Sequence, residues 1–250
     1  MDKRLVFDTI PELFDKWRPR YCAEAFSDII ESAALSNTSR MLEIGPGTGQ
    51  ATEPFLRSGC AYLAIELGAN FTGVMRDKFG SYPNFDIVNA DFETHDFGGA
   101  QFDLIFSAAA IQWIPEEIGF GRSYELLRPG GMLAMMVCKG EYKTPNEALY
   151  ERIQEVYAEF FKPEQPYRCN LEYENTVNYG FAANVVREYP SRRVYNADDY
   201  VELIKTHSDH ITLGEPYRAK FFEGIRKSIL DFGDEIVIND TIVVRSAVKL

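Results

Sequence analysis

Three glycines at alternate positions, Gly45, Gly47 and Gly49, are the residues of this sequence best suited to approach a ligand. They follow an apolar run at 40–44 that predicts a buried strand, and a helical pattern begins at Ala51. Glycine lets the backbone turn sharply, and the N-terminus of the following helix presents free N–H groups. A strand, a glycine-rich turn and a helix in this order are typical of a nucleotide-binding corner.

The spacing of these glycines differs from that of two related loops. A P-loop ends in Gly-Lys-Ser/Thr, and this loop has no such lysine. A dinucleotide fingerprint has its third glycine three residues after the second, where this chain has Gln50. Pro46 also stiffens the loop and removes one N–H donor. The loop therefore favours a nucleoside-type ligand, although an ordinary glycine-rich turn stays open as an alternative.

Acidic residues follow the next two expected strands. The strand at 60–65 ends on Glu66, a position that faces the ligand crevice of a strand-helix-strand unit and can accept both hydroxyls of a ribose. A solvated acid at a helix N-terminus is the alternative. Asp91 and Phe92 follow the strand at 84–89. Together they suit an adenine, because a carboxylate accepts from the exocyclic amine and a ring packs on the base.

The composition limits the classes of protein to consider. The chain has 250 residues, 46% of them hydrophobic, which suffices for a sizeable α/β core. Its net charge of −12 repels phosphate backbones, so we expect no nucleic-acid partner. The four cysteines form no C-x-x-C pair, which indicates free thiols and a cytoplasmic location. We expect neither a signal peptide nor a membrane span, because no apolar run is long enough.

The elements that position these residues alternate between strand and helix in the first half of the chain, which predicts a doubly wound parallel sheet. Small residues from Ser107 to Ala110 follow the fourth strand and leave room for a ligand, and Trp113 either walls that pocket or belongs to the core. The strands are expected at 40–44, 60–65, 84–89, 102–107 and 132–138, with helices at 21–35, 51–58, 69–79 and 115–127 and a tight turn at 128–131.

The second half has a different pattern, with helices expected at 145–161, 197–207 and 215–232 and strands at 185–195 and 241–248. No linker separates the halves. We therefore expect a single domain, 1–250, with a helical lid inserted in its second half. Its core is about 36–138 plus 185–195 and 241–248, and its lid is about 139–184 and 196–235.

Taken together, these motifs resemble the class I S-adenosylmethionine-dependent methyltransferases. The segment at 14–21 and the run at 107–113 also resemble the small-molecule branch that includes trans-aconitate methyltransferase-like proteins. The motifs that carry the resemblance recur in order at 42–49, Glu66, 91–93, 102–107 and 126–131.

The resemblance implies a Rossmann-like, seven-stranded, mostly parallel sheet whose last strand is antiparallel, with 185–195 and 241–248 as strands 6 and 7. It implies S-adenosyl-L-methionine as cofactor and no metal. The glycine loop would approach the methionine and ribose portion, and the residues at 107–108 would line the methionine end. The implied cofactor-binding residues are Arg18, Tyr21, Glu43, Gly45, Pro46, Gly47, Gly49, Glu66, Leu67, Asp91, Phe92, Ser107, Ala108 and Trp113.

The expected reaction is methyl transfer to a small-molecule acceptor by O-methylation of a carboxylate or hydroxyl. Relatives that methylate amide or exocyclic amine nitrogens usually carry Asn/Asp-Pro-Pro-Tyr/Phe after the fourth strand, where this chain has Ser-Ala-Ala-Ala. A carboxylate acceptor is already ionised and needs no base. If a base acts, His207 and His210 are the candidates, although they could equally be a surface pair or a metal pair without further ligands.

Two other functions remain open. A nicotinamide-dependent oxidoreductase uses a similar sheet, but Gln50 in place of the third glycine speaks against it. A non-catalytic protein that binds S-adenosylmethionine would carry the same loop and the same Glu66. The sequence does not specify the oligomeric state.

Overall fold

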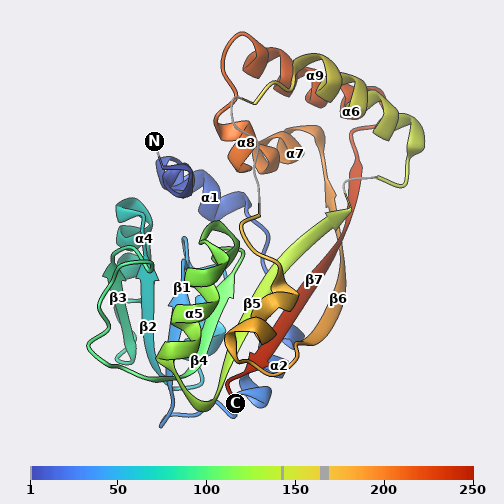
Figure 1. Cartoon of the computed structure of the whole chain (residues 1–250). Helices are drawn as coiled ribbons and strands as arrows, with labels where there is room; N and C mark the ends of the chain where they lie inside the picture. The colour runs from blue at the N-terminus through green and yellow to red at the C-terminus, as the bar shows by residue number, and fades with distance from the viewer. Residues whose placement is uncertain (1, 142–143, 164–168) are drawn as a thin grey trace. The chain divides into compact units, whose positions relative to one another are not determined.

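The computed structural model describes residues 2–141, 144–163 and 169–250, and within them seven strands form one sheet in the order β3-β2-β1-β4-β5-β7-β6 (Figure 1). Each pair of neighbours from β3 to β5 is parallel, and β7 runs in the opposite direction. The predicted Rossmann-like fold is confirmed. The strands are β1 Arg40–Ile44, β2 Ala61–Glu66, β3 Phe85–Asn89, β4 Phe102–Ala108, β5 Leu127–Glu141, β6 Val185–Tyr195 and β7 Ile236–Val248.

Helices connect these strands and also make up most of the second half of the chain. The α-helices are α1 Pro11–Trp17, α2 Ala23–Ser32, α3 Thr52–Leu56, α4 Ala69–Phe79, α5 Glu116–Leu126, α6 Glu147–Phe160, α7 Ala197–Ile204, α8 Ser208–Ile211 and α9 Tyr217–Asp231. Short 3₁₀ helices are η1 Lys3–Leu5, η2 Phe7–Thr9, η3 Ile111–Trp113 and η4 Tyr173–Tyr179. Within the described residues, no helix is both long and apolar enough to span a bilayer.

The chain folds into two compact units. The helical unit comprises Met1–Arg18, Lys139–Arg168 and Pro190–Thr241, and the sheet unit comprises Pro19–Cys138, Cys169–Tyr189 and Ile242–Leu250. Residues 169–184, which we expected in the lid, therefore belong to the sheet unit. The description of the whole chain as one domain with a lid stays a prediction.

Apolar side chains cover both faces of the sheet, as is typical of parallel sheets. Side chains of β1 alternate between the faces, so that Met41 packs with α2, α3 and α4, whereas Leu42 and Ile44 pack with α5 and its neighbours. This apolar run ends where Gly45 begins the loop, and its amide donates to the carbonyl of Ile65 at 2.9 Å. The strand ends thus hold the start of the loop in place.

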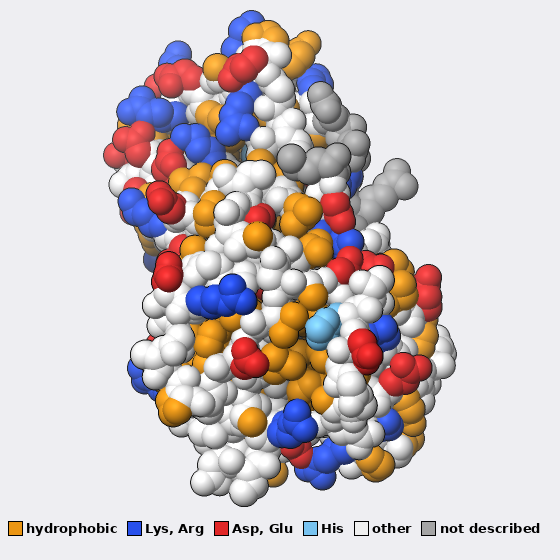
Figure 2. Space-filling view, turned by 90° about the vertical axis from the view of Figure 1, so that its left-hand side faces the viewer, with side chains coloured by type: hydrophobic (Ala, Val, Ile, Leu, Met, Phe, Trp, Pro, Cys, Tyr) orange, Lys and Arg blue, Asp and Glu red, His pale blue; other side chains and the backbone are white. Residues whose placement is uncertain are grey.

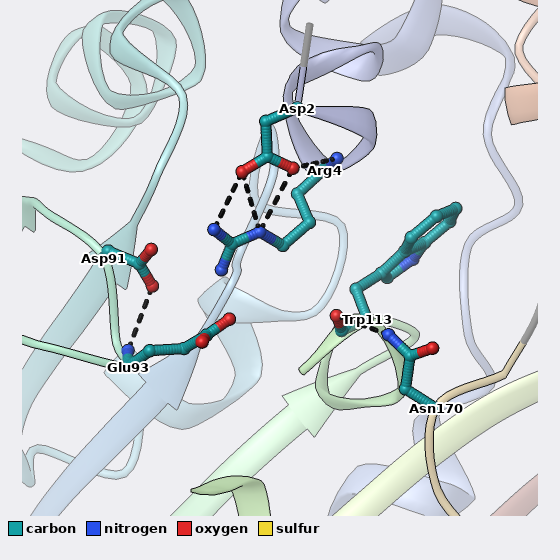
Figure 3. A network of polar contacts seen from close by, with 6 residues as sticks. All are labelled: Asp2, Arg4, Asp91, Glu93, Trp113 and Asn170. Atoms are coloured by element: carbon teal, nitrogen blue, oxygen red, sulfur yellow. Dashed lines mark hydrogen bonds and ion pairs between the residues drawn. The ribbon is translucent and has the colours of Figure 1, made fainter. Parts of the chain in front are cut away.

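The helical unit has its own core, built from apolar faces of α6, α7 and α9. Asparagines cap two of these helices: the Asn146 side chain accepts from the amide of Leu149 at 3.1 Å, and the Asn196 side chain accepts from that of Asp199 at 2.8 Å. In η1, the Asp2 carboxylate accepts from the guanidinium of Arg4 at 2.8 Å (Figure 3).

Two expected elements differ from the structure. The predicted turn at 128–131 is wrong, because β5 already begins at Leu127, and the register against β4 shifts between Phe102 and Leu104. The helix expected at 197–207 is divided into α7 and α8. The Thr206 hydroxyl donates to the carbonyl of Leu203 at 2.6 Å and closes the last turn, so that His207 precedes a new helix.

Candidate cofactor site

The three glycines of the loop all adopt backbone conformations that other residues avoid. Gly45, Gly47 and Gly49 have φ values of 63°, 59° and 83°, in the left-handed region. A Cβ atom on Gly45 would lie 2.5 Å from the Cβ of Ala110, and one on Gly49 would overlap the ring of Phe79. Conformation and packing therefore both require glycine at these two positions.

Glu66 lies against this loop, and its contact with a ribose stays a prediction. Its Oε2 accepts from the amide of Gly47 at 3.0 Å, and its Oε1 accepts from the amide of Gly68 at 2.8 Å. The side chain is buried, with 7% of its surface exposed. These two amides therefore orient the carboxylate at the start of the loop.

Glu43 ends up in a more enclosed environment than Glu66. Its Oε2 accepts from the Thr52 hydroxyl at 2.8 Å and from the Tyr62 hydroxyl, and its Oε1 is buried without a hydrogen-bond partner. The pKa of Glu43 is raised to about 8, mainly by burial and to a smaller extent by the nearby charge of Glu66, whereas the hydrogen bond from Thr52 lowers it. Glu43 thus joins β1 to β2 and α3, and its contact with a cofactor stays a prediction.

Ser107 ties the ends of two strands together. Its hydroxyl donates to the carbonyl of Ile44 at 3.1 Å and accepts from the amide of Ile111 at 2.9 Å. After it, Ala109 has a φ of 54°, rare for a residue with a side chain, and its amide donates to the carbonyl of Met136 at 2.8 Å. These bonds fix the small residues beside the glycine loop.

The predicted adenine pair lies at the end of β3. The Asp91 Oδ1 accepts from the amide of Glu93 at 2.9 Å (Figure 3). The ring of Phe92 is 4% exposed, lies 6.1 Å from the ring of Phe97, and has the guanidinium of Arg122 at 5.6 Å. Phe92 therefore belongs to the core, and a role of either residue at an adenine stays a prediction.

A segment far along the chain joins the site at η3. The Asn170 side chain donates to the carbonyl of Trp113 at 2.9 Å, and its backbone amide donates to the carbonyl of Gln112 at 2.9 Å (Figure 3). The Glu116 carboxylate accepts from the amide of Glu172 at 2.8 Å. The sequence analysis missed these contacts, because nothing local in the composition of 169–173 indicates a partner.

The predicted cofactor residues Leu67, Tyr21 and Arg18 lie in different parts of the structure. Leu67 accepts through its carbonyl from the Asn89 side chain at 3.0 Å. Tyr21 belongs to the sheet unit, where its ring lies 6.3 Å from that of Phe26, whereas Arg18 closes the first segment of the helical unit. Contact of Arg18 and of Tyr21 with a cofactor stays a prediction.

The two histidines offered as bases lie in the helical unit. His210 is 6% exposed, its Nε2 lies 3.0 Å from the Tyr157 hydroxyl, and its ring is 4.6 Å from that of Phe161. Burial lowers the pKa of His210 to about 3. Burial also lowers the pKa of His207, with smaller contributions from the charges of Arg18, His210 and Arg193.

A group with so low a pKa is a weak base near neutral pH, so catalysis by His210 stays a prediction. The alternative of a surface pair is wrong, because His210 is buried. Within the described residues, no group of three or more His, Cys, Asp or Glu side chains is arranged to hold a metal ion.

Comparisons with known proteins agree with this geometry. Residues 42–135 match the family described as "Methyltransferase domain". The chain is 39% identical over 69 residues to ribosomal RNA small subunit methyltransferase A of Hahella chejuensis, covering 28% of this chain and 25% of that one. It is 33% identical over 97 residues to a malonyl-[acyl-carrier protein] O-methyltransferase of Enterobacter lignolyticus, covering 38% of each. The chain thus matches less than half the length of either relative.

Solved structures share the fold over most of the chain. A putative type II methyltransferase from Anaeromyxobacter dehalogenans superposes with a TM-score of 0.65 at 17% identity, covering 92% of this chain and 97% of that one. A phosphoethanolamine N-methyltransferase 2 of Haemonchus contortus, in complex with phosphomonomethylethanolamine and S-adenosylhomocysteine, gives 0.60 at 19% identity, covering 99% and 58%. The segment that holds the glycine loop, Glu66, Asp91 and Ser107 therefore lies within the residues that match the methyltransferase family, and the chain shares the fold of these structures.

Proposed function

We propose that this protein is an S-adenosylmethionine-dependent methyltransferase that O-methylates a carboxylate or hydroxyl of a small molecule. The observation that carries this proposal is the contact between Glu66 and the amide of Gly47. It unites the two most specific sequence features, a glycine loop with left-handed conformations and an acid at the end of β2. Both lie within the segment that matches the methyltransferase family.

The residues present fit this cofactor. The amides of Gly47 and Gly68 orient the Glu66 carboxylate, a group whose oxygens are acceptors of the kind that ribose hydroxyls require. The small residues from Ala108 to Ala110 lie beside the loop, where only glycine at position 45 fits against the Cβ of Ala110. When bound, the cofactor supplies a methyl group activated by a positively charged sulfur. The work left to the protein is to align the acceptor and exclude water, which can account for much of a rate enhancement.

A small carboxylate or hydroxyl is the favoured acceptor class. The net charge of −12 opposes binding of RNA, and Figure 2 shows acidic and basic side chains intermixed on the face it presents. A carboxylate needs no base, which suits a chain whose candidate histidines have lowered pKa values. The similarity to a malonyl-[acyl-carrier protein] O-methyltransferase supports O-methylation. Because the chain is also similar to a ribosomal RNA methyltransferase, RNA is the alternative acceptor that an experiment must test.

The test is a turnover assay with the full chain. Labelled S-adenosylmethionine is incubated with a panel of small carboxylic acids and phenols, with a ribosomal RNA fragment and without acceptor, and the released S-adenosylhomocysteine is measured. We expect release with at least one acid or phenol above the blank, and loss of it in the Gly45→Val variant, whose side chain would overlap Ala110. Release with RNA alone would contradict the proposed acceptor class.

A further inference from the structure

Arg245 is a buried cation whose donors are not satisfied. It lies on β7 and is 8% exposed, and its Nε and Nη1 atoms are both buried without a hydrogen-bond partner among the residues that the structure describes. An arginine cannot lose its proton in a protein, and a buried N–H group without a partner costs free energy. Such a group in a native fold requires an explanation.

The described residues next to Arg245 contact its guanidinium group but accept no hydrogen bond from its Nε and Nη1 atoms. The guanidinium carbon lies 4.8 Å from the centre of the Tyr173 ring, a cation–π contact. The nearest acid oxygen is Oε1 of Glu174, 3.5 Å from Nε, and that side chain is 68% exposed. An ion pair at this distance to an exposed carboxylate contributes little.

Two other arginines of the chain, Arg193 and Arg187, have hydrogen-bond acceptors within the fold. Arg193 donates to the buried Asp240 and, at 2.6 Å, to the Tyr195 hydroxyl. Arg187 donates to the Ser32 hydroxyl at 3.0 Å. Arg245 differs from both, because none of the described residues accepts a hydrogen bond from its buried Nε and Nη1 atoms.

The position of Arg245 in the sheet connects it to the candidate site. The amide of Lys249 donates to the carbonyl of Gly131 at 2.9 Å, which sets the antiparallel register of β7 against β5. Continuing this register by four residues sets Arg245 opposite Met135, which pairs with Ser107 on β4. Arg245 therefore lies level with the carboxyl ends of the central strands, where the glycine loop begins.

The residues around Tyr173 belong to the same region. Burial raises the pKa of Tyr173 above its usual range, so its hydroxyl remains a neutral donor, and Tyr21 is close enough to contribute to this shift. The segment that leads to Tyr173 is hydrogen-bonded to η3 through Asn170. On η3, the Oε1 of Gln112 is also buried without a hydrogen-bond partner.

We propose that Arg245, with the ring of Tyr173 behind it, binds an anionic oxyacid group, a carboxylate or a phosphate, at one end of the acceptor. This inference rests on the proposed methyltransferase function. The glycine loop follows β1, which lies three strands away from β7 in the sheet. At the usual strand spacing this is roughly 14 Å. The anionic group would therefore be distant from the methylated atom, and the acceptor is an acid that carries a second, methyl-accepting group.

The test compares Arg245→Met with Arg187→Met, a matched control at an exposed arginine. Calorimetry measures binding of S-adenosylhomocysteine, and then of succinate, neutral succinamide or inorganic phosphate to the protein saturated with it. We expect wild type and R187M to bind succinate or phosphate but not succinamide. In R245M that affinity should fall about 10-fold or more, because charge-assisted hydrogen bonds are lost, while affinity for S-adenosylhomocysteine stays the same.

Thermal unfolding without ligand distinguishes a binding role from a structural one. Replacing a guanidinium that has unsatisfied donors by methionine should cost no stability. We therefore expect the Tm of R245M to equal or exceed that of wild type. The better of the two anions identifies the acceptor group as a carboxylate or a phosphate.

Three outcomes would overturn the inference: an R245M that binds anions like wild type, an R245M whose Tm falls well below that of R187M, or a wild type that binds S-adenosylhomocysteine but neither anion. Failure to bind S-adenosylhomocysteine would instead overturn the proposed function, and the anion titration of the free protein would still report on Arg245.

Discussion

At the scale of single residues, two acids at the ends of neighbouring strands are placed in contrasting environments. Glu66 is held by two backbone amides at the glycine loop, whereas Glu43 is enclosed by Thr52 and Tyr62. Burial and the charge of Glu66 raise the pKa of Glu43 to about 8. Near neutral pH the carboxyl group of Glu43 therefore favours its neutral form, whereas Glu66 is the acid that contacts the glycine loop.

The raised pKa of Glu43 predicts a pH-dependent stability. The folded protein keeps a proton that the unfolded chain releases, so the wild type loses stability as pH rises from about 4.5 to about 8. Glu43→Gln lacks this loss. We expect its Tm, relative to wild type, to rise by roughly 10 °C or more across that window, because a pKa raised from 4.5 to about 8 corresponds to about 5 kcal/mol, at about 2–4 °C per kcal/mol. A relative Tm that is constant between pH 4.5 and pH 8.5 in differential scanning calorimetry would contradict the assignment.

The sequence was sufficient to predict those residues whose conformation depends on local chemistry. Gly45, Gly47 and Gly49 require left-handed conformations, and alternate glycines after an apolar strand predict that directly. Tyr62 could not be predicted as the partner of Glu43, because their contact joins two strands that the pattern does not align. For Arg245 a signal existed, since it is the one charge within the expected apolar strand at 241–248.

At the scale of elements, the helical unit is built around an aromatic cluster. The ring of His210 lies 5.8 Å from Tyr157, 4.6 Å from Phe161 and 5.3 Å from Phe221, which come from α6 and its end and from α9. The histidine supplies a ring and a hydrogen bond to this cluster. Its Nδ1 is buried without a hydrogen-bond partner, which favours the neutral form.

The cluster predicts that the helical unit is sensitive to acid. The pKa of His210 is lowered from 6.5 to about 3, so the unfolded chain binds a proton that the folded one does not, and stability falls as pH drops below 6.5. His210→Phe removes this proton site. Between pH 7 and pH 5 we expect the variant to lose about 1–2 kcal/mol less of its free energy of unfolding than wild type.

Urea unfolding at the two pH values measures this difference. His95→Phe, at a half-buried histidine in the loop after β3, is the matched control and should keep the wild-type pH dependence. An H210F variant whose stability falls with acid as steeply as that of wild type would show that other groups cause the acid sensitivity.

Sequence patterns also predicted most elements, because hydrophobic periodicity is local. The strands at 40–44 and 185–195 and the helix at 69–79 have the predicted bounds. The beginning of β7 at Ile236 instead of 241 could not be predicted, since Asn239 and Asp240 disfavour a strand by composition. Asp240 is accommodated by its ion pair with Arg193.

At the scale of the whole molecule, the chain crosses between its two units several times. Residues 169–189 return to the sheet unit, where Phe181 and Leu171 enter the core on the α5 side. Only long-range contacts specify this return, so the sequence placed most of the segment in a lid. Tyr173, which we propose to help recognise an acceptor, lies on this segment, and Arg245 lies on β7 in the last segment of the same unit.

The central claim, that the glycine loop and Glu66 bind S-adenosylmethionine, is tested most directly by calorimetric titration of the full chain with S-adenosylhomocysteine. The variants are Glu66→Gln and, as a control, Glu125→Gln at an exposed position of α5, with NAD as the competing ligand. We predict binding in the roughly micromolar range, a loss of about 10- to 100-fold in E66Q only, and no binding of NAD. Binding of NAD alone, or equal affinity of wild type and E66Q for S-adenosylhomocysteine, would contradict it.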